Sequence, residues 1–371
     1  MDCSKTVTKS GKPIKLLIGG SPCTKWSIAQ KNGREVLPEG IGWELFENYR
    51  IAKEKFQPDL FLYENNKSAA QPIKDAIYSA LGGGKDASVR LTHINSALVS
   101  AQHRERFYVT NFGDIEQPED RGILLRDVLE SGEDLSCREK AYTLTASYGG
   151  AVAWSTLERN QRTMVAEPIR IGTIESNVKN RSHDSKQYRV YSPDGKATTL
   201  CGQGGGVGAK TGLYACPINE PINEIDGKPI YTVKNGLITI KDKQYPTELD
   251  DGYYLIRKLT PLECERLQTL SAGYTSGVSD TQRYRAIGNG FTAEIIIHIL
   301  NHALKDVPRD EELVVLSLYD GIATGRYCLD KMGFTNVKYY AYEIDPYAQK
   351  IAMSNYPDIV QCGDAFQIRD F

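Results

Sequence analysis

The sequence predicts an α/β protein with a mostly parallel sheet and helices on both faces. In residues 15–111, short apolar runs such as residues 16–18 alternate with segments of helical periodicity. The same alternation returns after residue 256. Strands that alternate with helices in this way form βαβ units, and buried parallel strands read as near-continuous apolar runs.

The first α/β part pairs each predicted strand with a predicted helix. The run IKLLIGG is followed by GWELFENYRIAKEKF, whose Trp43, Phe46 and Tyr49 recur at helical spacing. PDLFLYENN reads as a second buried strand. QPIKDAIYSALGG carries a proline near its start and glycines after its end, which is the usual punctuation of a helix.

The last part repeats the pattern from residue 256 onward. LTPLECERLQTL and TAEIIIHILNHAL are predicted helices, and ELVVLSLYDGIATGRYCLDKMGF reads as strand, glycine loop and helix. VKYYAYEID, DPYAQKIAMSNYP and DIVQCGDAF follow as strand, helix and strand. Between the two α/β parts, residues 112–255 are rich in glycine and short polar runs. There KPIYTV and LITI flank Lys234-Asn235-Gly236, a hairpin signal. We therefore predict three segments: 1–111, a β-rich and loop-rich region 112–255, and 256–371.

Composition excludes several classes of protein. The 371 residues include 45 Lys and Arg and 47 Asp and Glu. The resulting net charge of −2 does not by itself indicate a nucleic-acid partner. No run approaches the roughly 20 apolar residues of a membrane helix, and the start MDCSKTVTKSGK is no signal peptide. None of the eight cysteines forms a CxxC pair, so neither a zinc ribbon nor a disulfide scaffold is expected. We expect a cytoplasmic protein without a membrane or metal partner.

One cluster of chemistry-bearing residues is predicted at the carboxyl ends of the early strands. Cys23 follows the first strand in GGSPCTKWS, at the edge where open α/β sheets bind ligands. Glu64 ends the PDLFLY strand and reaches the same edge. In VSAQHRERFYV, strand alternation puts Gln102, Arg104 and Arg106 on one face. From these residues alone, Cys23 is either a nucleophile or a small buried hydrophobe, and the arginines lie either beside a pocket or on a solvated face.

A second cluster follows the late strands. The loop after ELVVLSL contains Gly321 and Gly325, Glu343 ends the next strand about 20 residues on, and Asp364 follows the third. Together they describe an adenosine pocket, although both acids also suit strand-end caps. Asn289 in IGNGFT reads as a turn residue. His298 and His302 are four apart, but residue 299 is Ile, so the HExxH zinc pattern fails and a helix-face position is expected.

At this point the residues resemble a known family, the DNA (cytosine-5) methyltransferases. The glycine loop of residues 319–325 is similar to the S-adenosylmethionine loop of that family, in the form of its de novo vertebrate branch. The resemblance covers both α/β parts, and region 112–255 looks like the variable target-recognition insert. The other motifs that carry the resemblance are Gly20-Ser21-Pro22-Cys23, Glu64-Asn65-Asn66, Gln102-x-Arg104-x-Arg106, Arg257-x-Leu259-Thr260-x-x-Glu263-x-x-Arg266-Leu267-Gln268 and Gly288-Asn289-Gly290.

The order of the motifs departs from the usual family pattern. Ordinarily the cofactor loop precedes the Pro-Cys motif, whereas here the loop, Glu343 and Asp364 come last. The sequence therefore resembles a circular permutation cut between the third strand and the Cys23 strand, which is tolerable because domain termini often lie close together. Lys15 stands where the family commonly has Asp, and Thr24 stands where it commonly has Gln.

The resemblance implies a Rossmann-like S-adenosylmethionine-dependent methyltransferase fold and a mechanism. Cys23 would add to carbon 6 of a flipped-out cytosine in duplex DNA, and Glu64 would hold N3 and the exocyclic amine. Arg106, with Arg104 behind it, would orient that carboxylate and pin the O2 atom of the base. S-adenosylmethionine would donate the methyl group and leave as S-adenosylhomocysteine. The residues expected to hold it are Pro22, Asn289, Tyr319, Asp320, Gly321, Ile322, Thr324, Gly325, Glu343, Ile344, Asp364 and Ala365.

Other functions stay open at this stage. An RNA cytosine-5 methyltransferase shares the motif set, but the insert of roughly 140 residues is large enough to read duplex sequence through the major groove. A silent DNA-binding homologue would be expected to lack the thiol or the carboxylate, and a thymidylate-synthase-like enzyme would not need an adenosine pocket. A monomer from a phage or bacterial restriction-modification setting is expected, and an endonuclease partner is not deducible. The loop GQGGGVGAKTG, with Lys210, is either a DNA-facing loop or a plain flexible one.

Overall fold

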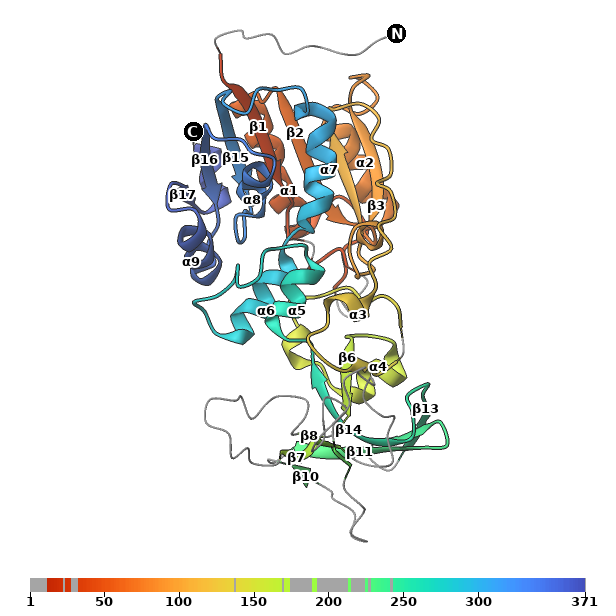
Figure 1. Cartoon of the computed structure of the whole chain (residues 1–371). Helices are drawn as coiled ribbons and strands as arrows, with labels where there is room; N and C mark the ends of the chain where they lie inside the picture. Colours follow the sequence, from red (N-terminus) through yellow and green to blue (C-terminus); the bar gives the residue numbers. More distant parts are fainter. Residues whose placement is uncertain are drawn as a thin grey trace, which may run out of the picture. The chain divides into compact units, whose positions relative to one another are not determined.

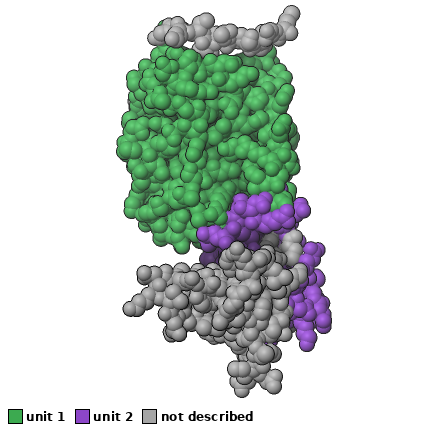
Figure 2. Space-filling view, viewed as in Figure 1, with its two compact units in different colours: residues 1–124, 143–149, 261–371 green, residues 125–142, 150–260 purple. Residues whose placement is uncertain are grey.

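The computed structural model describes residues 12–22, 24–27, 33–136, 138–168, 170–173, 189–191, 213–214, 224–225, 228–240 and 243–370. Cys23 and the loop that contains Lys210 lie outside these described residues. The chain divides into two compact units, coloured separately in Figure 2. Unit 1 contains Met1–Leu124, Thr143–Gly149 and Pro261–Phe371, and unit 2 contains Leu125–Tyr142 and Gly150–Thr260.

Unit 1 is built on a seven-stranded sheet with the order β17-β16-β15-β1-β2-β4-β3 (Figure 1). β4 runs antiparallel to both of its neighbours, and the other pairings are parallel. The strands are β1 (Ile14–Gly19), β2 (Leu60–Asn66), β3 (Arg90–Asn95), β4 (Glu105–Thr110), β15 (Leu313–Leu318), β16 (Val337–Tyr342) and β17 (Val360–Gly363).

The first strand of the chain lies in the middle of this sheet, next to the first of the last three strands. β1 pairs with β15 in parallel, with Leu16 opposite Val315 and Gly19 opposite Leu318. The residues 16–18 are fully buried, which explains why the strand reads as a continuous apolar run rather than an alternating one. The last three strands of the chain thus extend the sheet outward from β1, as the predicted permutation requires. The predicted α/β fold with a mostly parallel sheet is confirmed.

Helices cover both faces of the sheet, because neighbouring strand residues point to opposite sides. On one face Leu17 packs in a cluster with Phe46 and Ile77, and on the other Leu16 packs with Ile299. None of the helices in the described part of the chain combines the length and apolar character needed to cross a membrane. The helices of unit 1 are α1 (Gly40–Phe56), α2 (Gln71–Ala80), α5 (Pro261–Leu267), α6 (Asp280–Asn289), α7 (Ala293–Leu304), α8 (Thr324–Lys331) and α9 (Pro346–Asn355), with 3-10 turns η1 (Ser96–Leu98) and η4 (Ala365–Asp370).

Unit 2 is rich in antiparallel strands. Its larger sheet follows the path β13-β12-β11-β14-β6-β5, with β10 paired to β11, and a smaller sheet has the order β7-β8-β9. The elements are α3 (Leu125–Val128), β5 (Glu133–Asp134), α4 (Ala153–Arg159), β6 (Met164–Pro168), β7 (Arg170–Thr173), β8 (Arg189–Tyr191), β9 (Leu213–Tyr214), β10 (Glu224–Ile225), β11 (Lys228–Lys234), β12 (Leu237–Ile240), β13 (Lys243–Pro246) and β14 (Gly252–Lys258), and a 3-10 turn η2 (Tyr148–Gly150) crosses the boundary between the units.

The predicted hairpin of the middle region is confirmed as β11 and β12, which pair antiparallel. Its turn residues Asn235 and Gly236 have φ angles of 53° and 69°. A two-residue hairpin turn with positive φ at both positions favours Asn-Gly, because these residues tolerate the left-handed region.

The boundaries of the units differ from the predicted segments at three places. Residues 256–260, predicted with the last segment, lie in unit 2. Residues 112–124 and 143–149, predicted with the middle region, lie in unit 1. The first stretch is tied to α7 by an ion pair between Arg121 and Glu294, whose atoms lie 2.7 Å apart. The second is tied to unit 1 where the Leu144 amide donates to Gln102 Oε1 over 2.8 Å. Contacts between residues so far apart in the sequence do not affect local composition, so composition could not predict these boundaries.

Candidate active site

The turn after β1 is anchored to β2. The Ser21 hydroxyl lies 2.7 Å from the Tyr63 hydroxyl, and Asn65 Nδ2 donates to the Ser21 carbonyl over 2.9 Å. A Cβ on Gly20 would lie 2.5 Å from the backbone oxygen of Glu64, so glycine is required where the turn passes β2. These contacts fix the backbone leading into Pro22, the residue before Cys23, next to the strand that carries Glu64.

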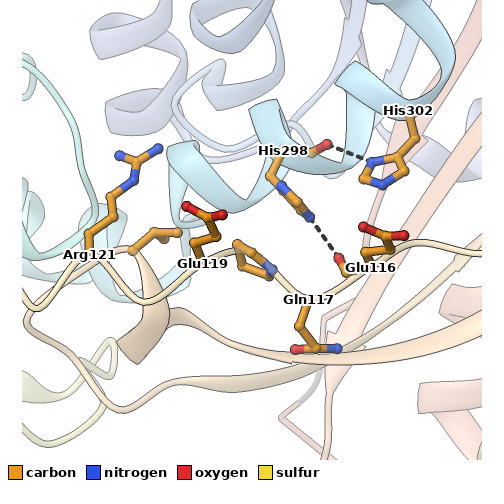
Figure 3. Close-up of a pocket in the computed structure, with 8 residues that line it drawn as sticks. Glu116, Gln117, Glu119, Arg121, His298 and His302 are labelled. Atoms are coloured by element: carbon orange, nitrogen blue, oxygen red, sulfur yellow. Dashed lines mark hydrogen bonds between the residues drawn. The ribbon is translucent and has the colours of Figure 1, made fainter.

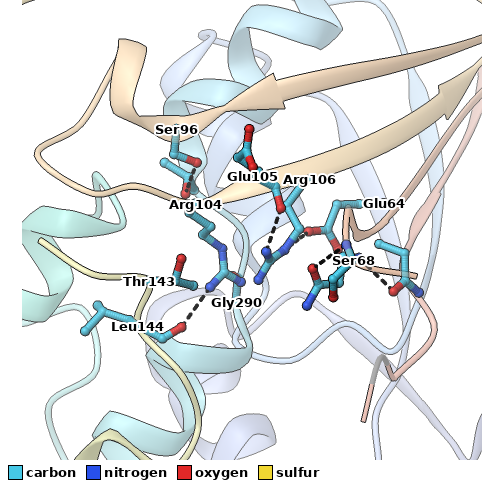
Figure 4. Close-up of polar contacts among 12 residues, drawn as sticks. Glu64, Ser68, Ser96, Arg104, Glu105, Arg106, Thr143, Leu144 and Gly290 are labelled. Carbon is cyan, nitrogen blue, oxygen red and sulfur yellow. Dashed lines mark hydrogen bonds and ion pairs between the residues drawn. The ribbon is translucent and has the colours of Figure 1, made fainter. Parts of the chain in front are cut away.

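Glu64 and Arg106 form an ion pair on neighbouring strands. Arg106 Nε lies 2.9 Å from Glu64 Oε1, and both side chains are nearly buried. Burial raises the pKa of the Glu64 carboxyl above its ordinary value, and the positive charges of Arg106 and Arg104 partly counter that rise. The arrangement therefore offers a carboxyl group that holds a proton more readily than usual beside a fixed guanidinium (Figure 4).

Arg104 is placed differently from its expected position behind Arg106. Its guanidinium donates to the backbone oxygens of Leu144, Gly288 and Gly290 over 3.0, 3.3 and 2.8 Å (Figure 4). Two of these hydrogen bonds hold the backbone on either side of Asn289, and the third holds the segment that contains Leu144. Its effect on Glu64 is through charge, since it lowers the pKa of that carboxyl.

Two buried glutamines also hold backbone segments near Arg104. The sequence interpretation gave neither of them a role. Gln102 Nε2 donates to the Leu267 carbonyl over 3.3 Å, and Gln268 Nε2 donates to the Ile287 carbonyl over 2.9 Å. Both side chains are fully buried. Buried amides are costly unless they are hydrogen-bonded, so these bonds fix the surrounding backbone. The sequence signal for Gln102 and Gln268 was that each belongs to one of the motifs that carry the family resemblance. Their hydrogen-bond partners could not be read from the sequence, because these partners depend on the tertiary structure.

The predicted cofactor loop begins at the end of β15. The Asp320 amide donates to the Tyr342 carbonyl over 3.1 Å, and the Gly321 amide donates to Glu343 Oε2 over 2.8 Å. Gly321 has a φ of 64°, and no atom lies within 4 Å of the place where a Cβ would stand. Glycine is therefore favoured here by the positive φ of the backbone and not by close packing. The space beside Gly321 is open, which would allow a ligand to approach the loop.

Gly325 is favoured instead because a neighbouring side chain leaves no room for a Cβ atom. A Cβ there would lie 2.6 Å from the Tyr339 hydroxyl. That hydroxyl donates to Asp320 Oδ1 over 2.7 Å, and Ser317 Oγ donates to the same oxygen over 2.7 Å. Burial raises the pKa of Asp320 to about 6 in spite of these donors. The Asp320 Oδ2 atom is buried without a hydrogen-bond partner.

Glu343 and Asp364, which follow β16 and β17, both accept hydrogen bonds from backbone amides one to two residues further along the chain. Glu343 Oε1 accepts from the amides of Ile344 and Asp345 over 2.8 and 2.7 Å. Asp364 Oδ1 accepts from the Phe366 amide over 3.0 Å, next to buried Ala365. Ile344, between Glu343 and the N-cap Asp345 of α9, is 69% exposed.

The remaining predicted residues surround the same loop. Tyr319 starts it, buried Ile322 has its carbonyl bound by the Tyr274 hydroxyl over 2.7 Å, and Thr324 is buried at the start of α8. Gly290 lies beside the loop, because a Cβ on it would be 3.8 Å from the Ile322 side chain. Asn289, which directly precedes Gly290, is exposed.

Family comparison decides the class of protein. The model of the C-5 cytosine-specific DNA methylase family matches residues 2–305. This chain belongs to the C-5 cytosine-specific DNA methylase family.

Relatives of this family member occur in Bacillus phages. It is 28% identical over 206 residues to the orphan methyltransferase M.SPBetaI of Bacillus phage SPbeta, a match covering 48% of this chain and 42% of that relative. It is 22% identical over 377 residues to the orphan methyltransferase M.SPRI of Bacillus phage SPR, covering 82% and 85%. The Entamoeba histolytica methyltransferase EhMeth matches with 13% identity and a TM-score of 0.38, covering 79% and 78%. The chain thus spans less than half the length of the SPbeta relative.

In this C-5 cytosine-specific DNA methylase the family match ends before β15. The strands β15 to β17, with the 319–325 loop, Glu343 and Asp364, lie beyond residue 305. The sheet order places β15 next to β1, with β16 and β17 following outward, so these strands belong to the same sheet as the matched residues.

A cavity of about 340 Å³ in unit 1 is lined by none of the predicted site residues (Figure 3). It lies between α7 and the segment 116–121. His298 Nε2 donates to the Glu116 carbonyl over 2.8 Å, and His302 Nδ1 donates to the His298 carbonyl over 3.0 Å. Both histidines lie partly buried on one face of α7, so the predicted helix-face position is confirmed.

Proposed function

We propose that this chain transfers a methyl group from S-adenosylmethionine to carbon 5 of a cytosine in duplex DNA. Family membership supports the reaction class. The observation that carries the proposal is the nearly buried pair of Glu64 and Arg106, held beside the anchored turn that leads into Cys23. Glu64, Arg104 and Arg106 are proposed on their geometry, and Cys23, which lies outside the described residues, on its sequence position.

The residues at the ends of β15, β16 and β17 fit the proposed cofactor. The open space beside Gly321, with its positive φ, suits a loop that a ligand approaches closely. Glu343 and Asp364 present carboxylates that match ribose hydroxyls and an adenine amine, and exposed Ile344 matches the face of an adenine ring. Tyr319, Asp320, Ile322, Thr324, Gly325, Ala365, Pro22 and Asn289 complete the proposed set. S-adenosylmethionine, when bound there, supplies an electrophilic methyl group.

The protein's part in the reaction begins with the thiolate of Cys23. Its sulfur forms a bond to carbon 6 of the base, and the ring electrons shift toward N3, which takes a proton from Glu64. Carbon 5 thereby becomes nucleophilic enough to accept the methyl group. Arg106 donates to the O2 atom as negative charge develops on the ring.

The methylated base is then released from Cys23. The carbon-5 proton leaves to water, N3 returns its proton to Glu64, and the bond between sulfur and carbon 6 breaks. The ring double bond and the Cys23 thiolate are restored. A base inside a duplex is out of reach of a buried carboxylate, so the cytosine has to be flipped out.

The β-rich unit 2 is proposed to read the DNA sequence around that cytosine. Its antiparallel sheet and loops are of a size that can contact base edges in the major groove. The phage relatives, named orphan methyltransferases, support a phage or bacterial modification setting.

Transfer of a labelled methyl group to unmethylated duplex DNA tests the proposal. We expect label at carbon 5 of cytosine in one short sequence context, loss of label in Cys23→Ala, and retained label in Cys3→Ala, a thiol outside every motif. Duplex DNA with fluorine in place of the carbon-5 hydrogen should trap Cys23 covalently, because fluorine cannot leave as a cation. Label on RNA alone would contradict the DNA substrate, and cofactor binding without transfer to either would indicate a silent homologue.

A further inference from the structure

The first residue of the cofactor loop holds an unusual backbone conformation. Tyr319 has a φ of 57°, in the left-handed region that bulky L-residues rarely adopt. Such a conformation persists where surrounding contacts impose it. The next two amides, of Asp320 and Gly321, already bond to the Tyr342 carbonyl and the Glu343 carboxylate. Whatever holds Tyr319 therefore sets the direction in which the loop leaves β15.

The Tyr319 hydroxyl is fixed by two groups on α1. It donates to the Leu45 carbonyl over 2.8 Å and accepts from Asn48 Nδ2 over 3.0 Å. Burial raises the pKa of this hydroxyl to about 12, so it remains a donor at neutral pH. Asn48 is fully buried, although asparagine is mostly a surface residue. A buried amide of this kind needs partners for both of its ends.

Arg369, in η4, supplies the other partner. Its Nε donates to Asn48 Oδ1 over 2.6 Å, its Nη2 donates to the Glu44 carbonyl over 3.0 Å, and its guanidinium lies 4.7 Å from the Phe366 ring centre. A guanidinium only donates, so the asparagine oxygen has to face Arg369. The amide nitrogen of Asn48 is then turned toward Tyr319. The arginine thus decides which end of the amide the tyrosine meets.

These contacts join three segments that are far apart in the sequence. α1 follows the segment that contains Cys23, Tyr319 starts the 319–325 loop, and η4 begins directly after Asp364. None of Asn48, Leu45 and Arg369 belongs to a motif that the sequence interpretation used. The Lys55 ammonium also donates to the Arg369 carbonyl over 3.0 Å, which ties η4 to α1 a second time.

We propose that Asn48 and Arg369 are positioning residues for the cofactor: Arg369 orients the Asn48 amide, which holds the Tyr319 hydroxyl and so fixes the start of the 319–325 loop. This inference rests on the proposed use of S-adenosylmethionine. A residue that acts through Tyr319 changes cofactor affinity and leaves the cytosine chemistry of Glu64 and Arg106 unchanged.

The test is the Kd of S-adenosylhomocysteine by calorimetry, for the full chain without DNA. Tyr319→Phe removes one hydroxyl, and Arg369→Met keeps an unbranched stem over Phe366. Each should weaken binding about tenfold, the scale of one hydrogen bond lost at a buried site. Because both act on one chain of contacts, the double variant should bind within about twofold of the weaker single variant. At saturating cofactor, the kcat of Arg369→Met, a residue outside the proposed cofactor set, should stay within about twofold of the unchanged protein.

Arg50→Met is the matched control. Arg50 lies on α1 and pairs with Glu47 and Glu54 on its partly exposed side, so the Kd should not change. Arg369→Lys keeps a donor and should recover part of the affinity. Unchanged Kd in Tyr319→Phe, or losses that simply multiply in the double variant, would overturn the inference. If the unchanged protein itself binds no S-adenosyl compound, the proposed function fails instead. Should Arg369→Met not fold, Tyr319→Phe and Arg369→Lys still decide the matter.

Discussion

Arg106 and Glu64 are diagonal neighbours on the antiparallel pair of β4 and β2, with 2.9 Å between their charged atoms. The register sets Arg106 opposite Asn66 and Tyr108 opposite Glu64. Residues two apart on a strand share a face, so the arginine reaches the carboxylate along that face. β4 is the strand of this sheet that runs antiparallel to its neighbours, and its direction is what brings the two motifs together.

Removing the charge of Arg106 should move the pH dependence of activity. In Arg106→Met the pKa of Glu64 loses one of the influences that lower it, so that pKa rises further. Because the proposed role needs Glu64 to hold a proton, the decline of kcat/KM at high pH should shift upward. The rate itself should fall by about 100-fold with the loss of a donor to the O2 atom. Arg106→Lys keeps the charge and should keep the position of the decline; a decline that moves downward in Arg106→Met would contradict the role of Glu64.

Arg104 should matter more for stability than for the pKa of Glu64. Arg104→Met removes one donor from each of the carbonyls of Leu144, Gly288 and Gly290, which should lower the free energy of unfolding by about 3 kcal/mol. Urea unfolding measures this. Arg285→Met, on α6 near the same loop, is the control: its side chain is 55% exposed and pairs with Asp345, so the change should stay below about 0.5 kcal/mol. Equal losses in both variants would refute the support role.

The two glycines of the 319–325 loop should respond differently to alanine. Gly325→Ala places a Cβ 2.6 Å from the Tyr339 hydroxyl and should cost about 2 kcal/mol of stability through overpacking. Adding Tyr339→Phe removes the obstructing oxygen, so the double variant should be more stable than the sum of the two losses predicts. In Gly321→Ala the space is open, and the φ of 64° should cost about 1 kcal/mol whether or not Tyr339 is changed. A double-mutant cycle in urea distinguishes these cases, and an additive Gly325 cycle would contradict the packing role.

Asp320 should make stability fall as pH rises from about 4 to about 6. Burial raises its pKa in the folded protein from 3.8 to about 6, so the folded state binds the proton more tightly than the unfolded chain. The resulting contribution is fully present below the unfolded pKa and is lost as pH rises through the folded one. About two pKa units correspond to roughly 3 kcal/mol as an upper limit. Urea unfolding of Asp320→Asn, which mimics the neutral form, should lack this dependence; the same slope in both proteins would rule it out.

Local sequence patterns predicted the α/β class and most elements. The apolar run of β1, the proline and glycines that bound α2, and Asn235-Gly236 in the β11–β12 turn each depend on neighbours close in the chain. The 319–325 loop was predicted after its strand for the same reason, because the apolar run stops where β15 ends. Glu64 was predicted at the end of its strand, whereas β2 continues to Asn66 because pairing with β4 extends it past the apolar run. The segments 112–124 and 143–149 were assigned to the middle region because their composition resembles it, whereas side-chain partners in unit 1 hold them.

The sequence by itself thus determined which residue types stand at the edge of the sheet, because period, turn residues and motif spacing are local properties. Only the tertiary structure decided what each of them touches. Arg104 holds the backbone around Asn289, Gly325 makes room for Tyr339, and Arg369 reaches Tyr319 through Asn48. Each of these contacts joins segments between about 14 and more than 300 residues apart, and their partners are set by strand register, helix packing and the direction of β4. Those are properties of the assembled sheet, so no stretch of sequence contains them.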